Sequence, residues 1–233
     1  MIRVLIIDEH PAVRAGLEAV MGAETGLVPV GAAVDTRGAL AAVARCRPDV
    51  AVIDYELPGE NGLLLCQRLS AAHAGPPRVV LYSGHDPADL ALGARLAGAH
   101  AVVGKTADVG ELLQALRAAG RGLRVLPPVP AVALGQLGAR LEAVELPILG
   151  MAMNGVPPAE MAAVLRLSER AVAGRLRRII MVLVAGLDGR SVAVATAPAP
   201  QRWGQRPADR EDMSRLRRDR VPRPLPAACA RSS

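Results

Sequence analysis

Short apolar runs alternate with segments of helical periodicity over roughly the first 120 residues. Five runs rich in Val, Ile and Leu are predicted strands, and they cover residues 4–7, 27–30, 50–53, 79–82 and 101–103. Apolar residues recur every three or four positions between and after these runs, which predicts helices. The predicted helices begin at Pro11 and then cover residues 36–46, 63–71, 87–97 and 108–119.

This alternation predicts one α/β domain over residues 1–122, with a doubly wound, five-stranded parallel sheet. The strand runs are continuously apolar, as expected for a sheet that helices cover on both faces. Pro29 lies inside the second run. Because proline cannot donate to a strand ladder, this run is predicted to be an edge strand.

The pattern changes after residue 122. Residues 123–136 contain three prolines, at positions 127, 128 and 130, and are expected to form a stiff linker. Residues 137–197 are again helical in pattern and predict a small all-α domain. Residues 198–233 are rich in Pro, Arg, Ala and Asp and are expected to be a disordered basic tail. The apolar run Ile179 to Leu187 is about half the length that spans a bilayer, so no membrane association is expected.

Charge and cysteine content narrow the function classes. Residues 1–124 carry a net charge of −1, residues 125–195 carry +2 and residues 196–233 carry +5, which together make the +6 of the chain. Affinity for a polyanion is therefore expected in the C-terminal half. Three cysteines without metal-binding spacing, and a start that does not resemble a signal sequence, predict a reduced cytoplasmic protein.

Five polar residues stand at the ends of predicted strands. They are Asp8, Glu9, Asp54, Ser83 and Lys105, and Lys105 is the only lysine among 28 basic residues. Because the carboxyl ends of parallel strands form one crevice, residues spread over about 100 positions are expected to meet there.

Their chemistry suits phosphoryl transfer. The carboxylates of Asp8, Glu9 and Asp54 are expected to bind Mg²⁺. Asp54 can act as the nucleophile and form an aspartyl phosphate. The compact ammonium of Lys105 would neutralise charge on the transferred group, and the Ser83 hydroxyl would donate to a phosphoryl oxygen.

Local motifs agree with this prediction. They are Asp8-Glu9-His10-Pro11-x-Val13-Arg14-x-Gly16-Leu17, Asp54-x-x-Leu57-Pro58-Gly59-x-x-Gly62, Ser83-Gly84 and Gly98-Ala99-x-x-x-x-x-Lys105. Together they resemble the receiver domain of NarL/FixJ-type response regulators. The resemblance implies a CheY-like fold, a Mg²⁺ cofactor and a sensor histidine kinase as phosphodonor.

The chain departs from this family at three positions. Glu9 stands where the family usually has a second Asp, and it keeps the charge. The aromatic switch of the fifth strand falls on Val102, so Tyr82 or Tyr55 could take over this role or merely pack. Thr106 replaces the proline that commonly follows the lysine.

A second motif lies between residues 158 and 179. A short helix is predicted to end near Leu165, and Ser168 is a suitable N-cap for the next one. Val172, Leu176 and Ile179 form the apolar stripe of that second helix, whose other faces are basic. Two short helices joined tightly, the second of them basic, predict a helix-turn-helix.

This segment resembles the LuxR-type DNA-binding domain that usually follows such receivers. The resemblance places base-reading positions on Ala173, Gly174 and Arg177 and phosphate-contacting positions on Arg175 and Arg178. Ala and Gly can read little of a base edge, so phosphate contacts would dominate binding to double-stranded DNA. The alternative is that the arginines form only a solvated basic face.

The sequence is compatible with three functions to different degrees. The first is a transcription regulator that is phosphorylated on Asp54 and binds paired DNA half-sites as a homodimer. The second is a receiver that acts through protein contacts, with a helix-turn-helix that binds DNA weakly or without specificity. The third, an independent enzyme, has little support, because the chain has no catalytic triad, nucleotide-binding loop or zinc-ligand spacing.

Overall fold

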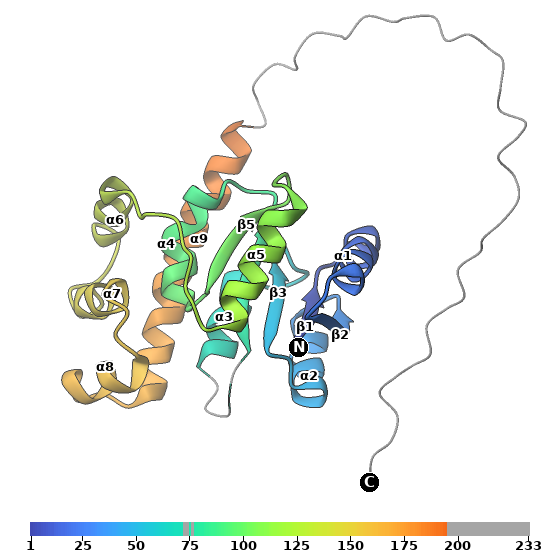
Figure 1. The fold of residues 1–233 in the computed structure, drawn as a ribbon. Helices are drawn as coiled ribbons and strands as arrows, with labels where there is room; N and C mark the ends of the chain where they lie inside the picture. Colours follow the sequence, from blue (N-terminus) through green and yellow to red (C-terminus); the bar gives the residue numbers. More distant parts are fainter. Residues whose placement is uncertain (72–74, 76, 195–233) are drawn as a thin grey trace, which may run out of the picture.

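The computed structural model describes residues 1–71, 75 and 77–194, so the expected tail over 198–233 lies outside the described residues. The N-terminal part contains one parallel sheet with strand order β2-β1-β3-β4-β5 (Figure 1). The strands are β1 (Ile2–Ile7), β2 (Leu27–Ala33), β3 (Val50–Asp54), β4 (Arg78–Ser83) and β5 (Ala101–Gly104). The predicted fold class, a doubly wound five-stranded parallel sheet, is confirmed, and β2 lies at an edge.

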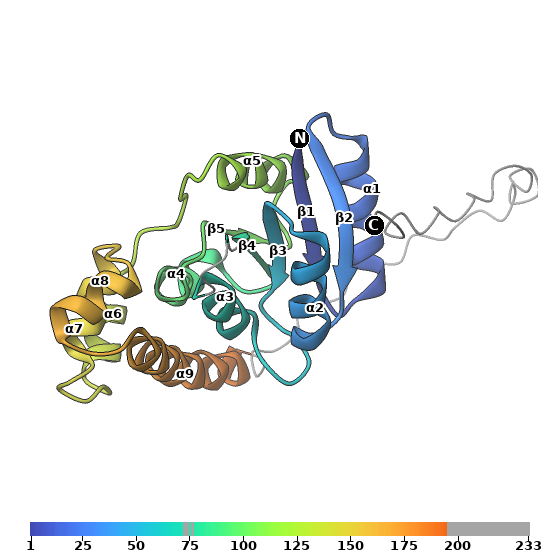
Figure 2. The same ribbon diagram turned by 90° about the horizontal axis from the view of Figure 1, so that it is seen from below.

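Helices cover both faces of the sheet (Figure 2). They are α1 (Pro11–Ala23), α2 (Thr36–Cys46), α3 (Gly62–Ser70), α4 (Pro87–Ala97) and α5 (Val109–Gly120). Alternate strand residues point to opposite faces. Val4 and Ile6 of β1 therefore pack with α1 and α5, whereas Leu5 and Ile7 pack with α2, α3 and α4. The continuous apolar runs thus fill two cores.

Within the described part of the chain, four helices follow the sheet domain. They are α6 (Ala131–Gly138), α7 (Leu146–Met153), α8 (Pro158–Leu165) and α9 (Glu169–Val194). Helix α6 begins inside residues 123–136, which were expected to be a linker, so part of that segment is helical. The proline-free stretch after Pro130 explains this, because residues 131–138 include five apolar side chains, of which those of Ala133 and Leu134 pack against the core and that of Leu137 is fully buried.

The helix-turn-helix consists of α8 and α9. Arg166 ends α8 in the left-handed conformation, with a φ of 53°, and the Leu167 N–H donates to the carbonyl of Ala162 at 2.9 Å. The Ser168 hydroxyl accepts a hydrogen bond from the Ala171 N–H at 3.2 Å, as its predicted capping role requires. Helix α9 then continues without a break for 26 residues, about 39 Å.

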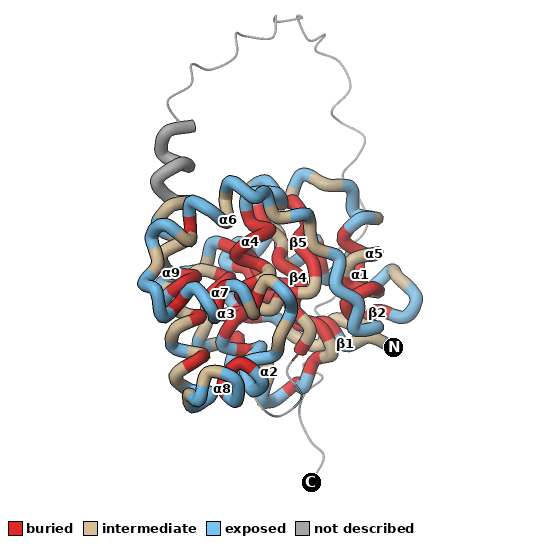
Figure 3. Tube along the Cα trace, turned by 90° about the vertical axis from the view of Figure 1, so that its left-hand side faces the viewer, coloured by how far each residue is buried: buried red, intermediate tan, exposed pale blue. Residues whose placement is uncertain are grey.

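Helix α9 packs along helices α3 and α4 of the sheet domain, and we call this contact the α9 seam (Figures 1 and 2). The buried apolar residues of α3 and α4 belong to one cluster with those of α7 and α9. Figure 3 shows that each of these helices has buried positions. Gly93 of α4 allows close approach, because a Cβ atom there would lie 2.6 Å from Leu63 Cδ1 and 3.2 Å from Leu183 Cδ2. The two parts of the chain therefore share a core.

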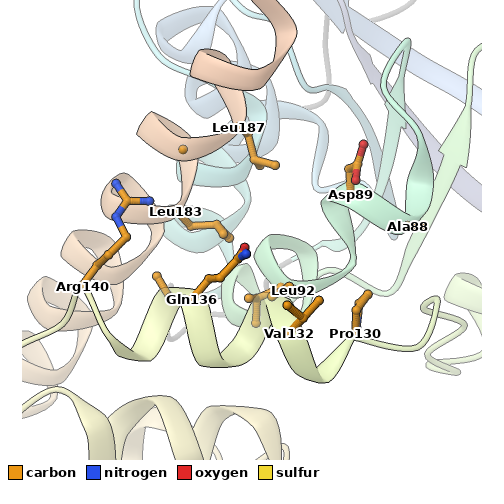
Figure 4. A pocket seen from close by; sticks show the side chains of 12 residues that line it. Ala88, Asp89, Leu92, Pro130, Val132, Gln136, Arg140, Leu183 and Leu187 are labelled. Atoms are coloured by element: carbon orange, nitrogen blue, oxygen red, sulfur yellow. The ribbon is translucent and has the colours of Figure 1, made fainter. Parts of the chain in front are cut away.

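Packing is incomplete at one end of the α9 seam. A cavity of about 280 Å³ lies between α4, α6 and α9, and Leu92, Leu183 and Leu187 contribute apolar side chains to it (Figure 4). Asp89 and Arg140 line it as well. The α9 seam is therefore not closely packed at this end.

Candidate functional site

The expected crevice residues stand where the strands end. Asp8 follows β1, Asp54 and Ser83 are the last residues of β3 and β4, and Lys105 follows β5. Since β1, β3, β4 and β5 are consecutive neighbours in the sheet, these ends lie side by side at its carboxyl edge. The parallel topology thus brings together residues that are up to 97 positions apart, as between Asp8 and Lys105.

Lys105 joins the two buried carboxylates. Its Nζ lies 2.8 Å from Asp8 Oδ2 and 2.6 Å from Asp54 Oδ2. The side chains of Asp8 and Asp54 are only 2% and 3% exposed, whereas that of Lys105 is 21% exposed. Two carboxylates therefore share one ammonium, which leaves the crevice with a net negative charge that would attract a cation.

Burial and the shared ammonium act in opposite directions on these groups. Burial raises the pKa of Asp54, and the nearby Asp8 charge adds to this rise, which the Lys105 hydrogen bond reduces without cancelling. Burial would also raise the pKa of Asp8, but hydrogen bonds from Lys105 and His10 outweigh it and lower the pKa. Burial would lower the pKa of Lys105, yet the two carboxylates raise it and keep the ammonium charged.

The oxygen ligands for a hard cation are present. Ligand atoms of Asp8, His10 and Asp54 lie within 4.8 Å of one another. Carboxylate oxygens suit Mg²⁺, whereas an imidazole nitrogen suits transition metals better. The His10 backbone N–H donates to Asp8 Oδ1 at 2.8 Å, so this residue holds the Asp8 carboxylate in place. Glu9 is 41% exposed, and its carboxylate lies 4.0 Å from the His10 ring instead of joining this group.

Ser83 is buried beside residues that the sequence motifs did not highlight. Its hydroxyl accepts a hydrogen bond from the His85 backbone N–H at 3.0 Å. The His85 ring stacks obliquely on Tyr55, with centroids 4.8 Å apart, and its Nδ1 lies 4.0 Å from Glu56 Oε1. Only the position of His85, two residues after Ser83, could have indicated this from the sequence.

The loop between β3 and α3 is tied closely to Asp54. The Glu56 N–H donates to Asp54 Oδ1 at 3.3 Å, and the Gly62 N–H donates to the carbonyl of Tyr55 at 2.7 Å. A Cβ atom on Gly62 would lie 2.1 Å from the Asp54 carbonyl oxygen. No side chain fits in that space, so Gly62 is required for the backbone to return so closely to Asp54.

We expect Gly62→Ala to destabilise the protein by about 2–3 kcal/mol and to slow phosphoryl uptake, because the loop beside Asp54 must move. Gly16→Ala on α1 is the matched control. Nothing lies within 4 Å of its added methyl, so helix propensity predicts a gain of up to about 1 kcal/mol. Urea denaturation of both variants measures the difference, and equal stabilities would contradict the steric argument.

The expected DNA-reading face of α9 is partly turned toward the receiver. The carbonyl of Ala173 accepts a hydrogen bond from Gln67 Nε2 of α3 at 3.2 Å. Arg177 Nη2 lies 2.7 Å from Glu60 Oε1 in the loop after Asp54. Gly174 has no atom within 4 Å of the position of an added Cβ, so it faces open space.

The two expected phosphate contacts differ in their surroundings. Arg178 is engaged by its own helical region, where it pairs with Glu142 and lies 3.4 Å from Glu145 Oε1. No ion pair of Arg175 with another described residue is found, and its side chain is partly exposed. Of the five expected DNA contacts, Gly174 and Arg175 have no described ion pair or hydrogen bond to another element, whereas Arg178 is paired but 56% exposed.

The receiver region matches a known family. Residues 4–117 match the response regulator receiver domain. This match, with the sheet order and the carboxyl-edge crevice, places the molecule in the class of receiver-containing signalling proteins. The predicted resemblance to this class is confirmed.

Similarity extends beyond the receiver. The DNA-binding transcriptional activator DevR/DosR of Mycobacterium tuberculosis is 31% identical over 207 residues, which cover 84% of this chain and 94% of that protein. The probable transcriptional regulatory protein NarL of the same species is 28% identical, with 84% and 93% covered. The chain therefore belongs to the response regulator family of two-component systems.

Solved structures agree on the fold. A LuxR-family response regulator from Aurantimonas is 30% identical, with a TM-score of 0.51 over 61% of this chain and 99% of that chain. The RcsB structure from Salmonella enterica bound to a promoter also has a TM-score of 0.51, over 78% of this chain and 91% of that one, but at 20% identity it supports the fold alone.

A different group of relatives shares less of its length. Protein-glutamate methylesterase/protein-glutamine glutaminase 5 of Myxococcus xanthus is 34% identical, and the match covers 66% of this chain but 48% of that enzyme.

Among the described residues, no helix combines the length and apolar character needed to cross a membrane.

Proposed function

We propose that this response regulator is phosphorylated on Asp54 by a sensor histidine kinase and acts as a DNA-binding transcription regulator. The observation that carries the proposal is the double contact of Lys105 Nζ with Asp8 at 2.8 Å and with Asp54 at 2.6 Å. A buried nucleophile, a second carboxylate and a cation are the groups that phosphoryl transfer to a carboxylate needs.

The geometry suggests how the chain would perform the transfer. Asp54 would attack the phosphorus of a phosphohistidine, so that a P–O bond forms while the P–N bond breaks and the imidazole leaves. Mg²⁺, held by Asp8 and Asp54, would supply charge neutralisation at the phosphoryl oxygens. The Lys105 ammonium would neutralise the negative charge that develops on the phosphoryl oxygens. The buried Ser83 hydroxyl would donate a hydrogen bond to one of these oxygens. Glu9, whose side chain is 41% exposed, would supply a further carboxylate oxygen to the ion, directly or through a bound water.

The helical region supports the second half of the proposal. DevR/DosR, which is named as a DNA-binding transcriptional activator, is matched over 94% of its length. Arg175 and Arg178 would contact phosphates. Arg177, which the resemblance places at a base-reading position, would also reach a phosphate, because the small residues Ala173 and Gly174 allow close approach to the groove. Two-fold binding of a homodimer to paired half-sites would follow from this mode of docking. Phosphorylation would shift the equilibrium toward a state in which α9 leaves the receiver.

Two alternatives remain distinct. A receiver that works through protein contacts is favoured by the small residues Ala173 and Gly174, which read little of a base edge. An enzymatic function of the methylesterase kind has weaker support, because the chain matches less than half of those enzymes. Neither alternative changes the proposed chemistry at Asp54.

Phosphoryl uptake tests the proposal. Incubation with acetyl phosphate and Mg²⁺ should add one phosphoryl group to the wild-type chain, as intact-mass spectrometry measures. Asp54→Asn should add none, and chelation of Mg²⁺ should stop uptake by the wild type. If the wild type takes up no phosphate, the proposed function fails even though the fold is that of a receiver.

A further inference from the structure

Glu60 connects the phosphorylation loop with the DNA-reading helix. It lies in the loop between β3 and α3, six residues after Asp54, and its carboxylate faces α9 across the seam. We propose that Glu60 is a latch that holds Arg177 against the receiver and that phosphorylation of Asp54 opens it through this loop. The inference rests on the proposed function, and it names the route by which the signal leaves the site.

The latch is a pair of ion pairs on one carboxylate. Glu60 Oε1 lies 2.7 Å from Arg177 Nη2, and Oε2 lies 2.8 Å from Arg68 Nη1 of α3. The Glu60 side chain is only 11% exposed, whereas the two arginines are 40% and 45% exposed. The two guanidinium groups outweigh the burial of Glu60 and lower its pKa. The carboxylate therefore stays charged, and Arg68 orients it toward α9.

The Glu60 loop has direct contact with the phosphoacceptor. The Glu56 N–H donates to Asp54 Oδ1 at one end of the loop, and Gly62 closes on the Tyr55 carbonyl at the other. Phosphorylation would convert a singly charged carboxylate into a group with about two negative charges and new oxygen acceptors. A loop anchored at both ends beside that group must adjust, and Glu60 lies within it.

The fifth strand lacks the aromatic residue through which the family's switch would act. Val102 occupies the position of the aromatic switch, is 6% exposed and has no polar group to signal with. The apolar contacts of Leu63 and Leu183 at Gly93 carry no charge that phosphorylation could change directly. The Glu60–Arg177 ion pair is thus the described contact across the seam that links the loop after Asp54 to the expected DNA-reading face.

The α9 seam also contains an open pocket. This pocket of about 280 Å³ lies between α4, α6 and α9, and Leu183 and Leu187 line it (Figure 4). A charge-assisted contact from the mostly buried Glu60 carboxylate adds to the apolar packing that favours the closed arrangement over the open one. Arg177 would exchange the Glu60 carboxylate for a DNA phosphate, which presents similar oxygens. DNA and phosphorylation would therefore favour the same open state.

The experiment removes each side of the latch in the full-length, unphosphorylated chain. Hydrogen–deuterium exchange follows residues 62–70 of α3 and 169–187 of α9 in Glu60→Ala and in Arg177→Ala. Each variant should exchange about tenfold faster than the wild type at the seam. Glu24→Ala is the matched control, because it removes the carboxylate that pairs with Arg117 away from the seam. Acetyl phosphate should accelerate exchange in the wild type and add less than about twofold in Glu60→Ala.

The outcomes separate the latch from the proposed function. Wild-type protection in both seam variants would overturn the latch, and so would continued protection in wild type that carries phosphate on Asp54. Faster exchange in both variants without any gain in DNA retention by Glu60→Ala would support the latch and refute the DNA-binding proposal. DNA retention by phosphorylated wild type, with the seam still protected, would refute the latch and leave the proposed function standing.

Discussion

Lys105→Met should lower the rate of phosphoryl uptake from acetyl phosphate by about 100-fold, the largest effect expected of any single receiver substitution that leaves Asp54 in place. The ammonium bridges two carboxylates that are almost fully buried, at 2.8 and 2.6 Å. Its removal leaves the transferred phosphoryl group without one of its two counter-charges. Met has a similar length and apolar stem, so the loss reports on the charge and much less on packing.

Two controls sharpen this prediction. Lys105→Arg keeps the charge but replaces a compact ammonium with a planar fork, so uptake should fall less than in Lys105→Met. Arg121→Met removes an exposed cation after α5 and should leave the rate unchanged. Initial rates from intact-mass spectrometry provide the comparison. A Lys105→Met rate within about threefold of the wild type would mean that the lysine is structural.

Arg177→Ala should weaken DNA retention by the phosphorylated chain about tenfold or more, the expected cost of removing one arginine that reaches DNA. The same substitution opens the α9 seam before phosphorylation, because it also removes the partner of Glu60. The Arg177→Ala variant should therefore show rapid hydrogen–deuterium exchange at the α9 seam and still bind DNA poorly. The slope of the logarithm of the binding constant against the logarithm of the salt concentration should become shallower by about one, as for the loss of one phosphate contact.

Arg45→Ala is the control, because it removes an exposed arginine from α2 in the receiver. It should change neither the affinity nor the salt slope beyond the small effect of net charge. Fluorescence anisotropy with labelled duplexes at several salt concentrations measures both quantities. Unchanged retention by Arg177→Ala would favour the alternative in which the receiver acts through protein contacts.

The sequence was sufficient to predict the receiver because its signals are local. Four of the five strand runs are followed within two residues by Asp8, Asp54, Ser83 or Lys105, and the rule that parallel strands end at one edge then places these residues together. The same local signals predicted the edge position of the strand that contains Pro29 and the cap at Ser168. No knowledge of the packing between domains was needed for these positions.

The contacts across the α9 seam could not be predicted in this way. Glu60 and Arg177 are 117 residues apart, and neither belongs to a motif that relates it to the other. The hydrogen bond from Gln67 to the Ala173 carbonyl spans 106 residues and uses a backbone acceptor that every residue has. Such pairs depend on how two helical surfaces meet, which periodicity within each helix does not determine. The exposure of Glu9 could not be predicted from the sequence either, because neighbouring side chains in a loop point in different directions.

DNA retention by the wild-type chain should be measured before and after treatment with acetyl phosphate and Mg²⁺, beside Asp54→Asn under identical conditions. We predict that treatment increases retention by the wild type at least tenfold and leaves Asp54→Asn at the untreated level. Equal retention by the treated and untreated wild type, with phosphate verified on Asp54, would contradict this prediction.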